Sequence, residues 1–226
     1  MKKNFLFSLG LLMSWLTLSS FTDGPDNSEN QVNGHEYVDL GLPSGTKWAT
    51  CNVGANNPWE YGGFYAWGET EEKHDYSWET YKWCNGSHGT MTKYCTNSNY
   101  GTLDGKTVLE PEDDVANVKW GGAWHMPTNR EMSELYYACT WEWTEYNGVS
   151  GYKVTGPNGN SIFLPAAGSR VKSSDVYGRD CLGRYWSSSL ERESDRAFDW
   201  EFDNKAPDEG DSEPRYKGQS VRPVCK

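Results

Sequence analysis

The chain has 226 residues, a formal net charge of -11 and many aromatic side chains, among them 12 tryptophans and 14 tyrosines. A chain this acidic repels nucleic acids and anionic membranes, so we expect neither as a partner. The length suits a single domain. Aromatic residues at this density either fill a β-rich core or line a binding surface, and the sequence leaves both possibilities open.

The N-terminus has the pattern of a secretory signal peptide over residues 1–20. A basic start, Met1-Lys2-Lys3, precedes an apolar run from Phe5 to Leu18 and then Ser19-Ser20. A buried N-terminal helix is the alternative. The apolar run is too short to span a membrane, no later stretch could do so, and no cysteine ends the run to carry a lipid anchor. We therefore expect a secreted or cell-surface protein in which residues 21–34, which are polar, form a flexible leader.

Six cysteines follow the predicted signal: Cys51, Cys84, Cys95, Cys139, Cys181 and Cys225. An even number in an exported chain predicts disulfides, and the absence of a CxxC motif argues against zinc. Cys84 and Cys95 lie within an irregular region, residues 56–100, that is rich in Gly, Asn, Trp and Tyr. Long loops of this kind are usually functional or crosslinked. A Cys84–Cys95 disulfide would stabilise this one by about 2–3 kcal/mol.

The first regular elements are two short extended runs in "EYVDLGLPSGTKWATCNV", separated by a turn at residues 43–45. The clearest helix is predicted over about residues 128–139. Thr128 and Glu131 fit a capping box, and apolar residues follow at helical spacing at Met132, Leu135, Tyr136 and Cys139. Since capping gives Thr128 and Glu131 a structural role, His125 is left as a lone histidine. We expect His125 to be a packed or surface residue and not a catalyst.

The pattern beyond the helix predicts strands. "GYKVTGPNGNSIFLPAAG" predicts a hairpin that turns at residues 157–159. Three more strands are expected in "RYWSSSL", "RAFDWEF" and "YKGQSVRPVCK", and the last two flank an acidic loop from Asp203 to Glu213. One helix with about seven short antiparallel strands and long irregular loops indicates an α+β domain.

Five stretches, taken in order, resemble the Fibrobacter succinogenes major paralogous domain family: "GLPSGTKWATCNVGA", "AWHMPTNREMSEL", "SIFLPAAGSR", "RYWSSS" and "GQSVRPVCK". The resemblance covers residues 35–226. It implies one exported or surface domain of Bacteroidetes type, with a C-type-lectin-like fold whose first and last strands pair, and no established activity. It also implies a Cys51–Cys225 disulfide, which leaves Cys139 with Cys181. Two departures from the family are His125, where arginine is usual, and Cys181.

The resemblance does not extend to the calcium site of sugar-binding C-type lectins, since the motifs Glu-Pro-Asn and Trp-Asn-Asp are absent. "EPEDD", residues 110–114, is similar to the first motif but precedes the predicted helix. It is better explained as the acidic start of a helix. We therefore expect no cofactor and no structural metal, with Asp113 and Asp114 as the first residues to examine for calcium.

The leading hypothesis is an adhesin-like, non-enzymatic domain that binds a glycan or a surface protein. In a C-type-lectin-like arrangement, residues 166–183 and the acidic loop 203–213 would be the variable loops. We predict binding at the first, by Arg170, Asp175, Tyr177, Arg179, Arg184 and Trp186. Tyr177 and Trp186 would be apolar platforms, and the arginines suit a ligand with carboxylate or sulfate groups. The alternative is that the arginines pair with nearby acids.

Two other classes of function stay open. One is a structural or assembly subunit of a surface fibre that binds a protein partner. The other is an enzyme, because "HMPTNREM" also resembles the helix start of the formylglycine-generating family. Those enzymes use a closely spaced cysteine pair late in the chain, whereas Cys181 and Cys225 are far apart. The four histidines lack ligand spacing, so we expect no enzyme.

Overall fold

The computed structural model describes residues 30–172 and 175–226. It confirms an α+β fold built mostly of short antiparallel strands. The predicted signal peptide and residues 21–29 of the predicted leader lie outside the described residues. Among the described residues, no helix is both long and apolar enough to cross a membrane.

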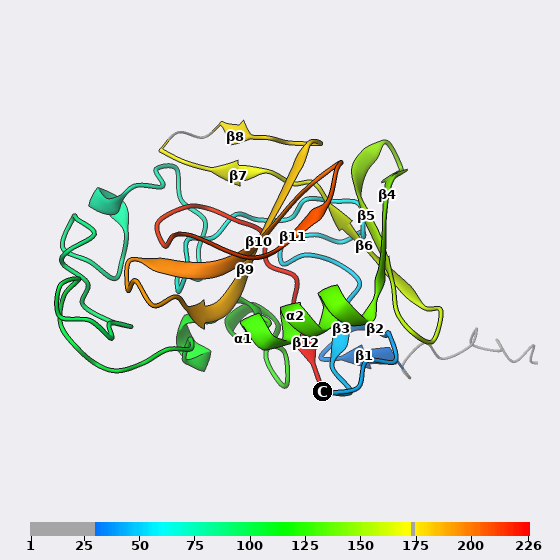
Figure 1. Cartoon of the computed structure of the whole chain (residues 1–226), viewed down its shortest axis with the longest axis horizontal. Helices are drawn as coiled ribbons and strands as arrows, with labels where there is room; N and C mark the ends of the chain where they lie inside the picture. The colour runs from blue at the N-terminus through cyan, green and yellow to red at the C-terminus, as the bar shows by residue number, and fades with distance from the viewer. Residues whose placement is uncertain (1–29, 173–174) are drawn as a thin grey trace, which may run out of the picture.

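A four-stranded sheet joins the beginning of the described chain to its end (Figure 1). Its order is β1-β2-β3-β12, with strands β1 (Gln31–Val32), β2 (His35–Asp39), β3 (Lys47–Ala49) and β12 (Val224–Cys225). Val224 lies opposite Trp48, so an early strand pairs with the last one, as the resemblance implied. Residues 31–32 were predicted to be part of a flexible leader, which is wrong: β1 pairs with β2.

Two helices pack on one side of the domain: α1 (Val115–Trp120) and α2 (Asn129–Ala138). The capping box of α2 is confirmed: the Thr128 amide donates to Glu131 Oε2 at 2.9 Å, and the Glu131 amide donates to Thr128 Oγ1 at 3.3 Å. Met132 and Leu135 are buried, as the helical spacing predicts. The prediction of one helix missed α1, although "EPEDD" was correctly assigned to a helix start. A short 3-10 turn, Pro111–Asp113, precedes Asp114, the N-cap of α1.

The remaining strands form two three-stranded sheets and one small hairpin. The first sheet, β4-β5-β6, comprises β4 (Thr140–Tyr146), β5 (Val149–Thr155) and β6 (Ser161–Pro165). The second, β9-β10-β11, comprises β9 (Leu182–Leu190), β10 (Arg196–Asp203) and β11 (Pro207–Pro214). The hairpin comprises β7 (Ser169–Arg170) and β8 (Val176–Tyr177), and lies on the opposite side of the molecule from α1 and α2 (Figure 1). The predicted acidic loop at residues 203–213 is wrong, because β11 pairs with β10 over most of it.

Most of the tryptophan and tyrosine side chains fill the interior, in three clusters of buried residues. Trp48, Trp67, Trp124 and Trp186 are all less than 2% exposed. Two arginines are buried with them. Arg222 donates to Asn52 and to the carbonyl oxygens of Ala49, Thr50 and Phe163. The C-terminal segment is thus tied to the end of β3 and to β6 by hydrogen bonds to backbone carbonyls.

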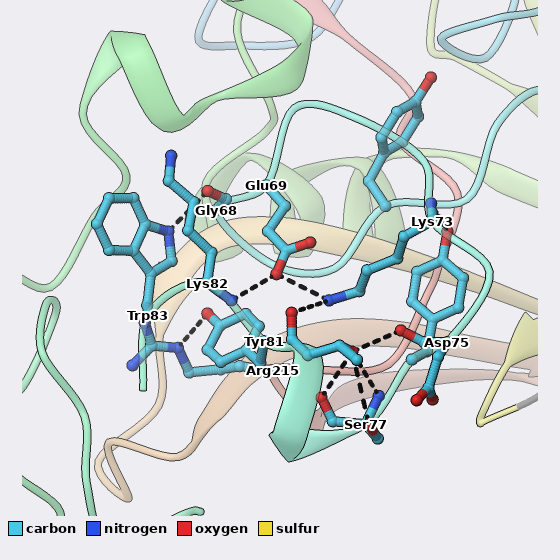
Figure 2. Close-up of polar contacts among 12 residues, drawn as sticks. Gly68, Glu69, Lys73, Asp75, Ser77, Tyr81, Lys82, Trp83 and Arg215 are labelled. Atoms are coloured by element: carbon cyan, nitrogen blue, oxygen red, sulfur yellow. Dashed lines mark hydrogen bonds and ion pairs between the residues drawn. The ribbon is translucent and has the colours of Figure 1, made fainter. Parts of the chain in front are cut away.

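Polar and aromatic contacts, and no disulfide, hold the irregular region from residue 56 to 100. Figure 2 shows the Glu69 carboxylate between Lys73 Nζ, at 2.9 Å, and the Lys82 amide, at 2.8 Å. Beside it, Arg215 is fully buried and donates from Nε to the Tyr81 hydroxyl at 2.9 Å. The same guanidinium donates to the carbonyl oxygens of Lys93, Tyr94 and Ser194. Its carbon lies within 6 Å of the ring centres of Trp67, Tyr81 and Tyr94.

All six cysteines are free in the structure. The pairs predicted from the sequence, Cys84–Cys95, Cys51–Cys225 and Cys139–Cys181, are therefore not present in it. Cys84 and Cys95 instead donate to carbonyl oxygens within their own loop. The expectation that this region needs a covalent crosslink overlooked Arg215, whose contacts lie more than 120 residues away in the sequence.

Candidate functional site

The strongest candidate site is a shallow groove of about 490 Å³ between the β7–β8 hairpin and the loop that follows β3. We call it the arginine groove. It is lined by Trp59, Glu60, Tyr61, Gly62, Phe64, Glu72, Val149, Arg170 and Arg179. It contains two of the arginines predicted to bind a ligand. It also contains three aromatic rings, of Trp59, Tyr61 and Phe64, that were not predicted from the sequence to be part of the site.

Each arginine of the groove lies over an aromatic ring. The Arg170 guanidinium carbon is 4.9 Å from the centre of the Phe64 ring, and that of Arg179 is 5.0 Å from the centre of the Tyr61 ring. Within the described residues, neither arginine has a carboxylate within ion-pair distance, and the buried Nε of Arg170 has no hydrogen-bond partner. A guanidinium stacked by its face keeps its N–H edges available to a carboxylate or sulfate.

The backbone fixes where these two side chains stand. Arg170 is on β7, and it exchanges two backbone hydrogen bonds with Gly218, at 2.8 and 2.9 Å. Arg179 follows β8, next to Asp180, which accepts a hydrogen bond from the Tyr61 hydroxyl. Burial and this hydrogen bond raise the pKa of Tyr61 to about 12, so the hydroxyl remains a donor at neutral pH.

The two acids of the groove are held by its own loops. Glu60 accepts from the backbone amides of Asn56 and Asn57 and from the Asn57 side chain, and these bonds lower its pKa. Glu72 accepts from the Phe64 amide at 2.9 Å. The carboxylates thus help to shape the loop, while the arginines face the groove with nothing else to pair with among the described residues.

Glycine is needed where the loop turns into the groove. Gly62 has a φ of 73°, and a Cβ there would lie 2.5 Å from the Val53 carbonyl oxygen. This close turn allows Tyr61 and Phe64, on either side of it, to present their rings to the arginines. The sequence signal for these residues was present in the Trp- and Gly-rich region from residue 56. However, no local pattern paired it with a hairpin more than 100 residues away.

Two of the predicted site residues are placed elsewhere. Trp186 is completely buried, and its indole Nε1 donates to the Tyr65 carbonyl at 2.9 Å, so its prediction as a ligand platform is wrong. Arg184 lies in what we call the acidic cluster, with Asp199, Glu201, Asp211 and Glu213. Its Nη1 is 3.0 Å from Asp199 and 2.7 Å from Glu213. For Arg184 the alternative prediction is confirmed, since this arginine pairs with neighbouring acids.

The other predicted binding residues surround the groove without lining it. Tyr177, on β8, is 74% exposed, and Asp175 precedes it on the same exposed hairpin. Asp180 contributes through Tyr61, as described above. Of the predicted site residues, Arg170 and Arg179 line the groove, whereas Arg184 and Trp186 do not. The groove also contains the rings of Trp59, Tyr61 and Phe64, which were not predicted.

The motif around His125 forms a structural junction. His125 Nε2 is 3.4 Å from Glu131, and its backbone pairs with Val224 on the last strand. Burial lowers the pKa of His125, but the hydrogen bond to Glu131 and the nearby charges outweigh burial, so the net pKa is raised. His125 thus joins the start of α2 to the C-terminal strand.

Asp113 and Asp114 are fully engaged with protein groups. Asp113 pairs with Lys93 and accepts from the Tyr94 hydroxyl at 2.7 Å, whereas Asp114 caps α1 and accepts from the Met126 amide at 2.7 Å. Among the described residues, no group of three or more His, Cys, Asp or Glu side chains could hold a metal ion.

Comparisons with protein families, with curated proteins and with solved structures found no match to this chain.

Proposed function

We propose that this chain is an exported, non-enzymatic binding domain of the adhesin type, and that it binds acidic glycans in the arginine groove. One observation supports this most. Two guanidinium groups lie on aromatic rings in a concave surface, and no carboxylate among the described residues pairs with them. Because the chain as a whole is acidic, such a pair of unpaired cations is a local contrast that favours an anionic ligand.

The chemistry of the groove suits an acidic sugar. The half-buried rings of Trp59 and Tyr61 line the groove and provide apolar surface for a sugar ring. The arginines would make charge-assisted hydrogen bonds to a uronate carboxylate or a sulfate, which are the strongest hydrogen bonds available to such a ligand. The resemblance to an exported C-type-lectin-like family agrees with a surface role, and the groove would bind without calcium.

The test is isothermal titration of the domain with oligogalacturonate and with a sulfated oligosaccharide, at low and at moderate salt. We expect binding that weakens as salt rises. The double variant Arg170→Ala/Arg179→Ala should bind at least about tenfold more weakly, since a hydrogen bond to a charged group contributes about 1.5–3 kcal/mol.

A matched control removes the same charge elsewhere. Arg130 and Arg192 are exposed and do not line the groove, so Arg130→Ala/Arg192→Ala should bind nearly as the parent does. Equal losses in both double variants would mean that overall charge, and not the groove, attracts the ligand. Binding to no acidic glycan at all would remove the proposal and favour a protein partner.

A further inference from the structure

A second groove, of about 470 Å³, lies on the outer face of the β4-β5-β6 sheet. We call it the sheet groove. Its floor includes Thr144, Tyr146, Lys153 and Phe163, and its wall includes Thr50 and Pro58. The opposite face of the same sheet packs into the core through residues such as Tyr152, Val154 and Leu164. The alternation of strand side chains thus assigns one face to the core and leaves the other open.

Glycine gives this open face its shape. Gly151 lies on β5, and a Cβ there would lie 2.8 Å from the Phe163 ring and 2.3 Å from the Leu164 carbonyl oxygen. The absence of a side chain at residue 151 leaves room for the end of the Phe163 ring. This ring lines the groove, although it is only 6% exposed.

The two grooves adjoin each other along two segments of the chain. In the loop after β3, Pro58 lines the sheet groove, while the next two residues, Trp59 and Glu60, line the arginine groove. Across the β4–β5 turn, Tyr146 lines the first and Val149 lines the second. Only a few residues of backbone therefore separate the grooves, on both sides.

A row of aromatic rings crosses this boundary. The Trp59 ring meets the Tyr146 ring edge to face, with centroids 5.1 Å apart, and Tyr146 meets Phe163 in the same way at 5.5 Å. Arginines mark one end of the row, and Lys153 lies at the other end, opposite Phe163 on β6 and Glu142 on β4. Lys153 is exposed and makes no ion pair within the described residues.

From this continuity we infer that the two grooves form one extended site, which holds a linear acidic oligosaccharide and not a single terminal sugar. The inference rests on the proposed function and deepens it. A row of aromatic rings offers apolar surface to successive sugar units, and cations at both ends suit an acid group that repeats along the chain. A monosaccharide or disaccharide would fill the arginine groove alone, whereas a longer chain would reach Tyr146 and Lys153.

The test is a length series of oligogalacturonates, from the disaccharide to the octasaccharide, titrated into the whole domain. We expect the affinity to rise at least about tenfold between the disaccharide and the hexasaccharide, as the longer ligand contacts the second groove. Lys153→Ala and Tyr146→Ala should each reduce this ratio severalfold. The control Tyr137→Ala removes an exposed aromatic side chain on α2, outside both grooves, and should keep the ratio.

The outcomes separate the two proposals. If short and long oligomers bind the parent equally well, or if the ratio survives in both Lys153→Ala and Tyr146→Ala, the extended site is wrong while the arginine groove stands. If no oligomer of any length binds, the proposed function fails and the extended site fails with it. Circular dichroism of each variant shows that a lost ratio is not lost folding.

Discussion

Three arginines that lie near one another in the sequence have two opposite environments. In the arginine groove, Arg170 and Arg179 stack on rings and have no carboxylate partner among the described residues. In the acidic cluster, Arg184 is only 12% exposed at its side chain and is surrounded by four carboxylates. The same residue type therefore serves the fold in one place and is left available for a ligand in the other.

The difference comes from what the neighbouring strands supply. Arg184 on β9 faces β10 and β11, which carry Asp199, Glu201, Asp211 and Glu213. All four acids lie within ion-pair distance of the Arg184 guanidinium. The β7–β8 hairpin instead faces a loop that supplies rings and backbone groups. An arginine there completes no internal ion pair, so its charge can serve a ligand.

The largest expected effect is on folding, from Arg184→Met. Removing one member of a buried ion network leaves uncompensated charge, and we expect the free energy of unfolding to fall by about 3–5 kcal/mol in urea denaturation. Arg179→Met, in the groove, should change it by less than about 1 kcal/mol, the value of an exposed cation–π contact.

A second variant keeps this prediction testable if Arg184→Met does not fold. Adding Asp199→Asn removes the most buried carboxyl group that Arg184→Met leaves without its partner, so the double variant should be more stable than Arg184→Met alone. Similar losses for Arg184→Met and Arg179→Met would contradict the distinction between the two arginine environments.

The next effect is a pH dependence that arises in the acidic cluster. Burial raises the pKa of Asp199 to about 7; Arg184 opposes this shift, and Asp211 and Glu213 add to it. Since the folded pKa lies above the unfolded one, the folded state holds a proton that the unfolded state releases. The free energy of unfolding should therefore fall by up to about 1 kcal/mol per pH unit as pH rises from about 4 to 7.

The measurement is urea denaturation at several pH values for the parent and for Asp199→Asn. The variant should lack this part of the slope, because asparagine does not titrate. Parallel profiles for the two proteins would show that Asp199 is ionised over the whole range. The account of the cluster would then be wrong, although the groove would be unaffected.

The smallest expected effect is on stability, from the N-cap of α2, and it involves neither arginine environment. Thr128→Ala removes the side chain that caps α2, and the free energy of unfolding should fall by about 1 kcal/mol. Thr128→Ser, which keeps the hydroxyl, is the matched control. A loss as large as that of Arg184→Met would mean that the helix start carries more of the fold than its hydrogen bonds suggest.

Features that depend on residues close together in the sequence could be predicted, whereas features that depend on distant residues could not. The capping box of α2 and the hairpin at residues 157–159 depend on neighbours within a few residues, and both were predicted correctly. Trp186 was misplaced because residues 185–188 of β9 are all buried, so alternation gives no sign of which face is exposed. Arg184 was misplaced because its partners lie 15 or more residues away on other strands.

The site itself was predictable only in part, for the same reason. Arg170 and Arg179 stood out as local positive charge in an acidic chain, which needs no knowledge of the fold. Their rings, Tyr61 and Phe64, come from a loop more than 100 residues earlier, and only the tertiary structure brings them together. The same holds for Arg215, which does in the structure what a disulfide was expected to do.

The most direct test of the central claim observes the two arginine environments in one sample. The Nε–H signals of nitrogen-15 labelled arginine can be followed by NMR as oligogalacturonate is added. Arg170 and Arg179, assigned by single substitution, should shift progressively and to saturation, while Arg184 keeps its position. If Arg184 moves and the groove arginines do not, or if all arginines move alike in proportion to ligand charge, the arginine groove is not the binding site.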